Sequence, residues 1–105
     1  MIYCYIYKYT IKMEINNLFK ALADGTRIKI LTHLKESDMT PSELLQKIKI
    51  SQPTLSHHLD ILKRIDLVIA EREGQFIRYS LNMSVFQMAL EFLLRFIKKE
   101  KKNEN

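Results

Sequence analysis

Two short helix patterns, separated by three residues in the middle of the chain, are compatible with few folds. Thr40 is a suitable N-cap, a proline follows at the first helical position, and Glu43 lies three residues after the cap. These residues form a capping box, which marks a helix start. Residues 49–51 would then be a turn, and Ser51 can cap the next helix. A helix, a three-residue turn and a second helix are typical of the helix-turn-helix motif.

The second helix of this pair, from Gln52 to about Arg64, has a well-defined buried side. Leu55, Leu59 and Leu62 recur at helical spacing, so the residues between them face outward. Near the helix start these outward residues are short, polar and uncharged, whereas surface helices usually carry Glu and Lys. Short donors and acceptors can reach base edges without bringing a repulsive carboxylate to DNA. We expect the base contacts to come from Gln52, Thr54, Ser56 and His57.

Two further helix patterns precede this pair. Apolar residues at helical spacing predict a short first helix within residues 15–22. Asp24 is the expected N-cap of a second helix. We expect Ile28, Leu31 and Leu34 to form the buried face of that second helix.

The residues after the helix pair predict a β-hairpin. Residues that favour strands occupy Leu67–Glu71 and Phe76–Leu81, and Gly74 permits a positive φ in the turn between them. A hairpin directly after a recognition helix is a wing, which can contact a phosphate backbone or a minor groove. The alternative, a purely structural hairpin, is favoured by the two glutamates near the turn. The wing residues expected to contact DNA are Arg72, Gln75 and Arg78.

The last predicted helix, from Ser84 to about Lys99, is apolar almost all round. A terminal helix on so small a domain cannot bury every face against its own chain. The remaining apolar surface should therefore meet a second copy of the chain, with the first helix as its companion. We expect a homodimer whose interface contains Ile15, Leu18, Phe19, Leu22, Val85, Met88, Ala89, Phe92, Leu93 and Phe96.

Together these patterns predict a mainly α fold with a small β-hairpin (α+β), a winged helix-turn-helix in the order α-α-α-α-β-β-α. We assign residues 13–99 to this dimerisation and DNA-binding domain and residues 100–105 to a charged tail. Residues 1–12 form an atypical leader in which tyrosines alternate with other residues. We interpret it as disordered or as not translated, with an edge strand or a dimer-contacting arm as the alternative.

The net charge of +5 is weak support for a nucleic-acid partner. From Met13 to Leu94 the chain has 10 basic and 10 acidic residues, so the excess lies at the two ends. A DNA-binding function must therefore rest on where individual charges lie. The residues expected to hold phosphates are Lys47, Lys49, Ser51, Lys63 and Arg64.

Composition and motifs exclude several other classes. The one cysteine excludes an internal disulfide framework and a zinc site with several thiolates. No apolar run approaches the roughly 18 residues that a membrane span needs. The chain has no nucleophile elbow and no glycine-rich phosphate loop, so we do not expect an enzyme. We expect a cytoplasmic protein.

Three segments, in order, resemble the ArsR family of winged-helix repressors: Asn17–Leu31, Leu55–Lys63 and Gly74–Asn82. The short last helix and the Gly-Gln-Phe-Ile wing are most similar to the SdpR-like autorepressor branch. Gly25 is a departure, since the family usually has proline there. The resemblance implies a homodimeric transcriptional repressor that binds double-stranded DNA at an inverted repeat, its own promoter being one such target.

Many members of this family release DNA when they bind a metal, but the ligands are missing here. The positions of the family's two cysteines hold Leu45 and Lys47, and the last helix contains no Asp, His or Cys. His57 and His58 project about 100° apart, so they cannot chelate one ion together. We expect His58 to be packed and bonded to a neighbouring backbone group. We therefore predict no metal, no other cofactor and no small-molecule substrate.

Without a metal, release would need another signal. The SdpR-like resemblance implies a sequestering membrane or protein partner, and an unregulated autorepressor is the alternative. The rival interpretation is a winged-helix protein-interaction module whose apolar terminal helix docks a protein partner. The neutral central stretch favours this alternative slightly.

Overall fold

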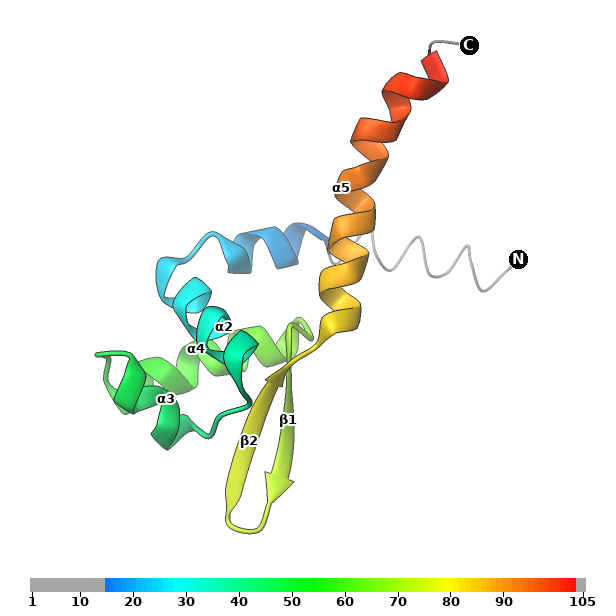
Figure 1. The fold of residues 1–105 in the computed structure, drawn as a ribbon. Helices are drawn as coiled ribbons and strands as arrows, with labels where there is room; N and C mark the ends of the chain where they lie inside the picture. The colour runs from blue at the N-terminus through cyan, green and yellow to red at the C-terminus, as the bar shows by residue number, and fades with distance from the viewer. Residues whose placement is uncertain (1–14, 104–105) are drawn as a thin grey trace.

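The computed structural model describes the backbone of residues 15–103 and the side chains of residues 15–97 (Figure 1). The leader, residues 1–12, therefore lies outside the described residues. The elements are a helix at residues 15–22, α2 (Gly25–Glu36), α3 (Pro41–Lys47), α4 (Gln52–Arg64), β1 (Val68–Glu73), β2 (Phe76–Leu81) and α5 (Met83–Asn103). This order confirms the predicted winged helix-turn-helix fold.

Helix starts are set by the predicted N-caps. The Asp24 carboxylate accepts from the backbone N–H at the start of α2, and the Ser51 hydroxyl does the same for α4. At α3 the capping box is complete, because Thr40 N–H donates to the Glu43 carboxylate at 2.9 Å and Glu43 N–H donates to the Thr40 hydroxyl at 3.3 Å. The connection from α3 to α4 spans residues 48–51, one residue more than predicted.

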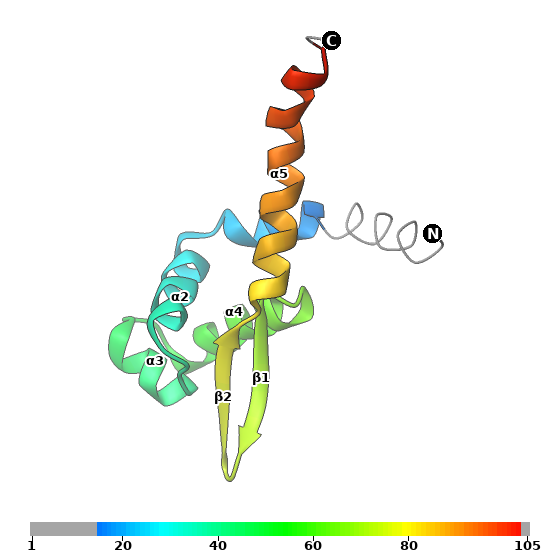
Figure 2. The same ribbon diagram turned by 45° about the vertical axis from the view of Figure 1, so that its right-hand side comes forward.

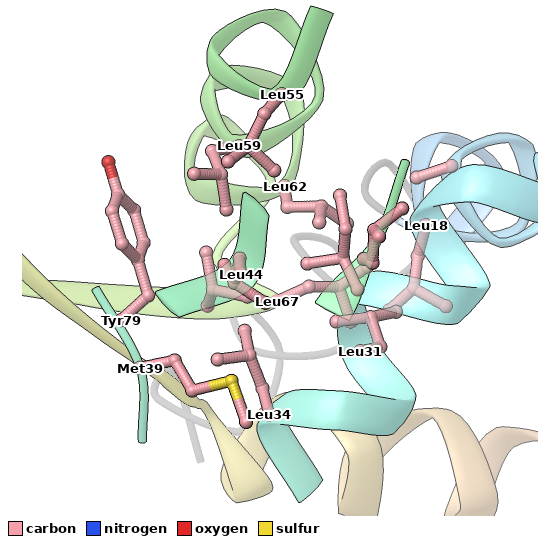
Figure 3. Packing of buried hydrophobic residues seen from close by; sticks show 14 of the residues in the cluster. Leu18, Leu31, Leu34, Met39, Leu44, Leu55, Leu59, Leu62, Leu67 and Tyr79 are labelled. Atoms are coloured by element: carbon pink, nitrogen blue, oxygen red, sulfur yellow. The ribbon is translucent and has the colours of Figure 1, made fainter. Parts of the chain in front are cut away.

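The core lies where α2, α3, α4 and the base of the hairpin meet (Figure 3). Leu55, Leu59 and Leu62 are buried along one side of α4, as the sequence predicts. Leu44 of α3 and Leu67, just before β1, are also completely buried. Because α4 buries its leucines, its polar residues are left on the outside of the domain.

The predicted buried face of α2 is wrong at one position. Ile28 is 42% exposed, whereas Ile30 is fully buried beside Leu31 and Leu34. Residues 28 and 30 lie about 200° apart on a helix, and the sequence permits either to join the other two. The face that contains Ile30 is the one that meets the core cluster.

The chain leaves α4 through a tight C-terminal cap. Asp66 adopts a positive φ of 63°, and its N–H donates to the carbonyl of Lys63 at 3.0 Å. The next N–H, that of Leu67, donates to the carbonyl of Leu62 at 2.9 Å. This pair of bonds is a Schellman motif, and the two leucines are packed in the core behind it. The cap directs the chain from α4 straight into β1.

The hairpin differs from the prediction in its turn. β1 continues to Glu73, which pairs with Phe76, so that only Gly74 and Gln75 connect the strands. Gly74 has a φ of 64°, a conformation that glycine adopts without steric cost. Arg72, expected in the turn, lies instead in β1 opposite Ile77. The strands begin pairing at Val68 with Leu81.

The hairpin and α5 project from the helical core in different directions (Figures 1 and 2). A backbone bridge ties the base of the wing to the segment before α3: Met39 N–H donates to the Tyr79 carbonyl at 3.0 Å, and Tyr79 N–H to the Met39 carbonyl at 2.8 Å. α5 begins one residue before the predicted helix and extends to Asn103, beyond the predicted end. Its first half packs on the core through residues such as Ala89.

Candidate nucleic-acid interface

The outer face of α4 is exposed and uncharged over its first two turns. All four residues predicted to read bases, Gln52, Thr54, Ser56 and His57, are exposed there. The Ser51 hydroxyl donates to that of Thr54 at 2.8 Å and accepts from the backbone N–H of Thr54 at 3.3 Å. Ser51 thus caps the helix and also bonds the exposed hydroxyl of Thr54. The first carboxylate on the exposed side of α4 is Asp60, beyond this region.

Three of the predicted phosphate-binding cations lie exposed around this face. Lys47 ends α3, Lys49 lies in the connection between the helices, and Lys63 is in the last turn of α4. Within the described part of the chain, none of them forms an ion pair. Their ammonium groups can therefore approach phosphates without first breaking an internal bond.

Arg64 lies in different surroundings. It lines a hollow of about 300 Å³ between the end of α4, the helix at residues 15–22 and α2. Lys20 and Arg27 line the same hollow, so it is basic. Arg64 thus lies beside the N-terminal helix at the end of α4, away from the exposed polar residues at the start of α4.

The wing residues predicted to contact DNA differ in their exposure and in their bonding within the chain. Arg72 and Gln75 are exposed, and no ion pair involves Arg72 among the residues described. Arg78 is half-buried and bonded within the chain: its Nε donates to Glu73 at 3.2 Å, and its Nη1 to the carbonyl of Asp38 at 3.1 Å and to Glu43 at 3.5 Å. Glu73 belongs to the wing itself, whereas the bonds to Asp38 and Glu43 hold the wing against α3 and the segment before it.

The Glu43 carboxylate is shared by these contacts. The backbone N–H of Thr40 holds the pKa of Glu43 below its usual value, and the charge of Arg78 lowers it further. Glu43 therefore remains ionised at neutral pH, and it both caps α3 and pairs with the wing.

His58 is packed, as predicted, but its bonding partner is a side chain. It is buried, and its Nδ1 lies 3.2 Å from Nη1 of Arg27 in α2. The prediction of a backbone partner is therefore wrong. The two residues are 31 positions apart, and no local pattern in the sequence reveals this contact.

The residues predicted for the dimer interface fall into three groups by burial. The buried group is Ile15, Leu18 and Ala89, the half-buried group is Leu22, Val85, Met88 and Phe92, and the exposed group is Phe19, Leu93 and Phe96. Four apolar residues of α5 that were not predicted are also exposed, namely Met83, Leu90, Leu94 and Ile97. The rings of Phe19 and Phe92 lie 6.2 Å apart, so the N-terminal helix and α5 contribute to one apolar surface.

Two other kinds of site, a metal centre and a membrane span, are not found in the described residues. Among the described residues, no three His, Cys, Asp or Glu side chains come together in a way that could hold a metal ion. Within that same part, no helix is long and apolar enough to span a bilayer.

Known proteins resemble this chain in sequence and in structure. The profile of the bacterial regulatory protein, arsR family, matches residues 24–70. The chain is 49% identical over 84 residues to the transcriptional repressor SdpR of Bacillus subtilis (strain 168), a match that covers 80% of this chain and 93% of SdpR. It is 32% identical over 80 residues to an arsenical resistance operon repressor of Staphylococcus aureus, covering 76% and 77% of the two chains.

Solved structures agree with these matches. An ArsR-like transcriptional regulator from Rhodococcus sp. RHA1 aligns with a TM-score of 0.82 and 28% identity, covering 90% of this chain and 89% of that one. The homodimeric winged helix-turn-helix DNA-binding domain Mb0332 of Mycobacterium bovis aligns with a TM-score of 0.69 and 25% identity, covering 87% and 85%.

Proposed function

Because the chain belongs to the ArsR family of bacterial regulatory proteins, we propose that it is a homodimeric repressor that binds an inverted repeat in its own promoter. Its relatives are transcriptional regulators and not enzymes. The observation that carries the proposal is the exposed, uncharged start of α4, bordered by cations that have no ion-pair partner within the described residues. Such a face can enter a major groove without electrostatic repulsion.

In the proposed complex two protomers form a homodimer, as in the homodimeric relative from Mycobacterium bovis, and we place the interface on the N-terminal helix and α5. The two copies of α4 would then occupy successive major grooves, about 34 Å apart. Gln52, Thr54, Ser56 and His57 would face the bases. Phosphates would be held by the Ser51 hydroxyl and by Lys47, Lys49 and Lys63, with Arg72 adding a contact from the wing. A dimer bound at a promoter would block access of the polymerase.

The test is direct binding to the DNA upstream of the chain's own coding sequence. A gel shift at about 100 mM salt should detect a complex with this DNA but not with a shuffled sequence of equal length. Footprinting should then protect two half-sites separated by about one helical turn. Equal binding to both DNAs would contradict sequence-specific recognition.

A protein partner is the second candidate, because α5 exposes large apolar residues, such as Phe96 at 65%. If this surface docks a partner and not a second copy, the purified chain should be monomeric. The sequestering membrane or protein partner that the sequence suggests stays a prediction.

A further inference from the structure

Arg27 connects three helices through one side chain. It belongs to α2, its Nε donates to the Ala21 carbonyl in the helix at residues 15–22 at 2.9 Å, and its Nη1 contacts His58 of α4. The Ala21 carbonyl lies in the last turn of its helix, where backbone acceptors lack helical partners and attract cations. The side chain of Arg27 is only 14% exposed. It is therefore a shielded polar link between α4 and the N-terminal helix.

The contact between Arg27 and His58 requires one protonation state. A guanidinium has donors and no acceptor, so Nδ1 of His58 must accept the hydrogen bond and carry no proton. The ring is then neutral, with its proton on Nε2. If Nδ1 gained a proton, two N–H groups would face each other and the hydrogen bond would break.

The surroundings of His58 offer a protonated ring little compensation. No carboxylate oxygen lies within 4.0 Å of it among the described residues. Asp24 is the acidic group in electrostatic range, but its carboxylate already accepts from the Arg27 backbone N–H at 3.0 Å. The other ionisable neighbours are basic: Arg27 itself, Lys20 and Arg64 around the adjoining hollow, and the ring of His57 at 5.7 Å.

We propose that Arg27 and His58 are positioning residues for DNA binding, and that protonation of His58 releases α4 from the N-terminal helix. This inference rests on the proposed function, in which the N-terminal helix forms the dimer and α4 reads the operator. The spacing of the two α4 helices must fit the DNA repeat, and a link from α4 to the dimer helix fixes that spacing. Breaking the link should weaken DNA binding without removing any side chain that touches DNA.

The test compares operator affinity at pH 8 and pH 6, at constant ionic strength, in three forms of the full chain. His58→Asn places a carbonyl oxygen where Nδ1 lies, so it keeps an acceptor for Arg27 but cannot titrate. His33→Asn is the matched control, because it removes a histidine of α2 that the proposed complex does not place at DNA. On acidification, the wild type and His33→Asn should each lose about tenfold more affinity than His58→Asn. Parallel pH profiles for the wild type and His58→Asn would overturn the proposal.

A second measurement needs no DNA, so it separates this proposal from the proposed function. The ¹⁵N signals of the His58 ring at pH 8 should show a protonated Nε2 and an unprotonated Nδ1. At pH 6 the backbone amides of residues 15–22 should exchange faster in the wild type than in His58→Asn. Both rates are first corrected for the intrinsic effect of pH on exchange. A proton on Nδ1 at pH 8, or equal exchange in both proteins, would overturn the link. A wild type that shows both signatures and binds no DNA at pH 8 would refute only the proposed function and the role in DNA binding that depends on it.

Discussion

Arg78 in β2 donates to the carboxylate of Glu43 in α3 across 3.5 Å, so an ion pair joins the wing to the first helix of the helix-turn-helix. The same guanidinium also bonds Glu73 and the carbonyl of Asp38. Arg72, in the exposed half of β1, has no ion-pair partner in the described part of the chain. The two wing arginines should therefore play different parts in DNA binding.

Replacing each arginine with alanine should separate these parts. Arg72→Ala should weaken binding to all DNA sequences and lower the slope of log affinity against log salt by about 1 for each phosphate that the shortened side chain no longer reaches. Arg78→Ala should leave that slope nearly unchanged, because its charge is used inside the chain. Anisotropy titrations at several salt concentrations measure both slopes. A decrease in slope for Arg78→Ala equal to that for Arg72→Ala would show that both arginines meet phosphates.

Acid should weaken the fold through Glu43. Its pKa is below the usual 4.5, mainly because the Thr40 N–H bonds the carboxylate. A group whose pKa is lower in the folded state contributes stability that is fully present above the unfolded value and is lost as pH falls through the folded value. The melting temperature of the wild type should therefore drop more between about pH 5 and pH 3 than that of Glu43→Gln.

The control for this acid titration is Glu91→Gln, which changes an exposed carboxylate on α5 that makes no ion pair within the described residues. It should follow the wild-type acid profile. If Glu43→Gln does so too, the capping box and the wing contact do not depend on the ionised carboxylate.

The features that were most predictable from the sequence are those set by contacts between residues close together in the chain. The capping signals at Asp24, Thr40 and Ser51 involve residues three positions apart, so the starts of α2, α3 and α4 were predictable. The extent of β1 was not, because Glu73 is held in the strand by its cross-strand partner Phe76. Strand pairing depends on register, which the hydrophobic pattern of the short hairpin does not fix.

Contacts between distant residues explain the remaining differences. The sequence allows Ile28 or Ile30 to face the core, and the packing of α2 against the other elements selects Ile30. The exposure of Gln52, Thr54, Ser56 and His57 was predictable because burial of the leucines of α4 fixes which residues face outward. Arg27 lies 31 positions from His58, and Glu43 lies 35 positions from Arg78, so only the fold reveals these contacts.

Thr54 should contribute to base recognition through its hydroxyl. Thr54→Val keeps the shape of the side chain and removes the donor, so operator binding should weaken by about 1–3 kcal/mol. Binding to random DNA should change much less. Thr32→Val is the control, since the Thr32 hydroxyl donates to the Ile28 carbonyl within α2 at 2.7 Å. Equal losses on operator and random DNA would remove Thr54 from the base-reading set.

The exposed side of α5 should hold the dimer together. Phe96 is 65% exposed in the single chain, and its ring packs edge-on against Phe92 at 5.3 Å. Phe96→Glu would place a charge in the proposed apolar seam, where burial without a partner is costly. Light scattering should give twice 12.5 kDa for the wild type and 12.5 kDa for Phe96→Glu at micromolar concentration.

Gln87→Glu adds the same charge at an exposed polar position of α5 and should remain dimeric. Because a monomer can engage only one half-site, operator affinity of Phe96→Glu should fall by about 10²-fold or more, while that of Gln87→Glu should stay near the wild-type value. A monomeric wild type would refute the dimer. A Phe96→Glu protein that stays dimeric would place the seam elsewhere, since the apolar end of α5 would then not be needed to join two chains.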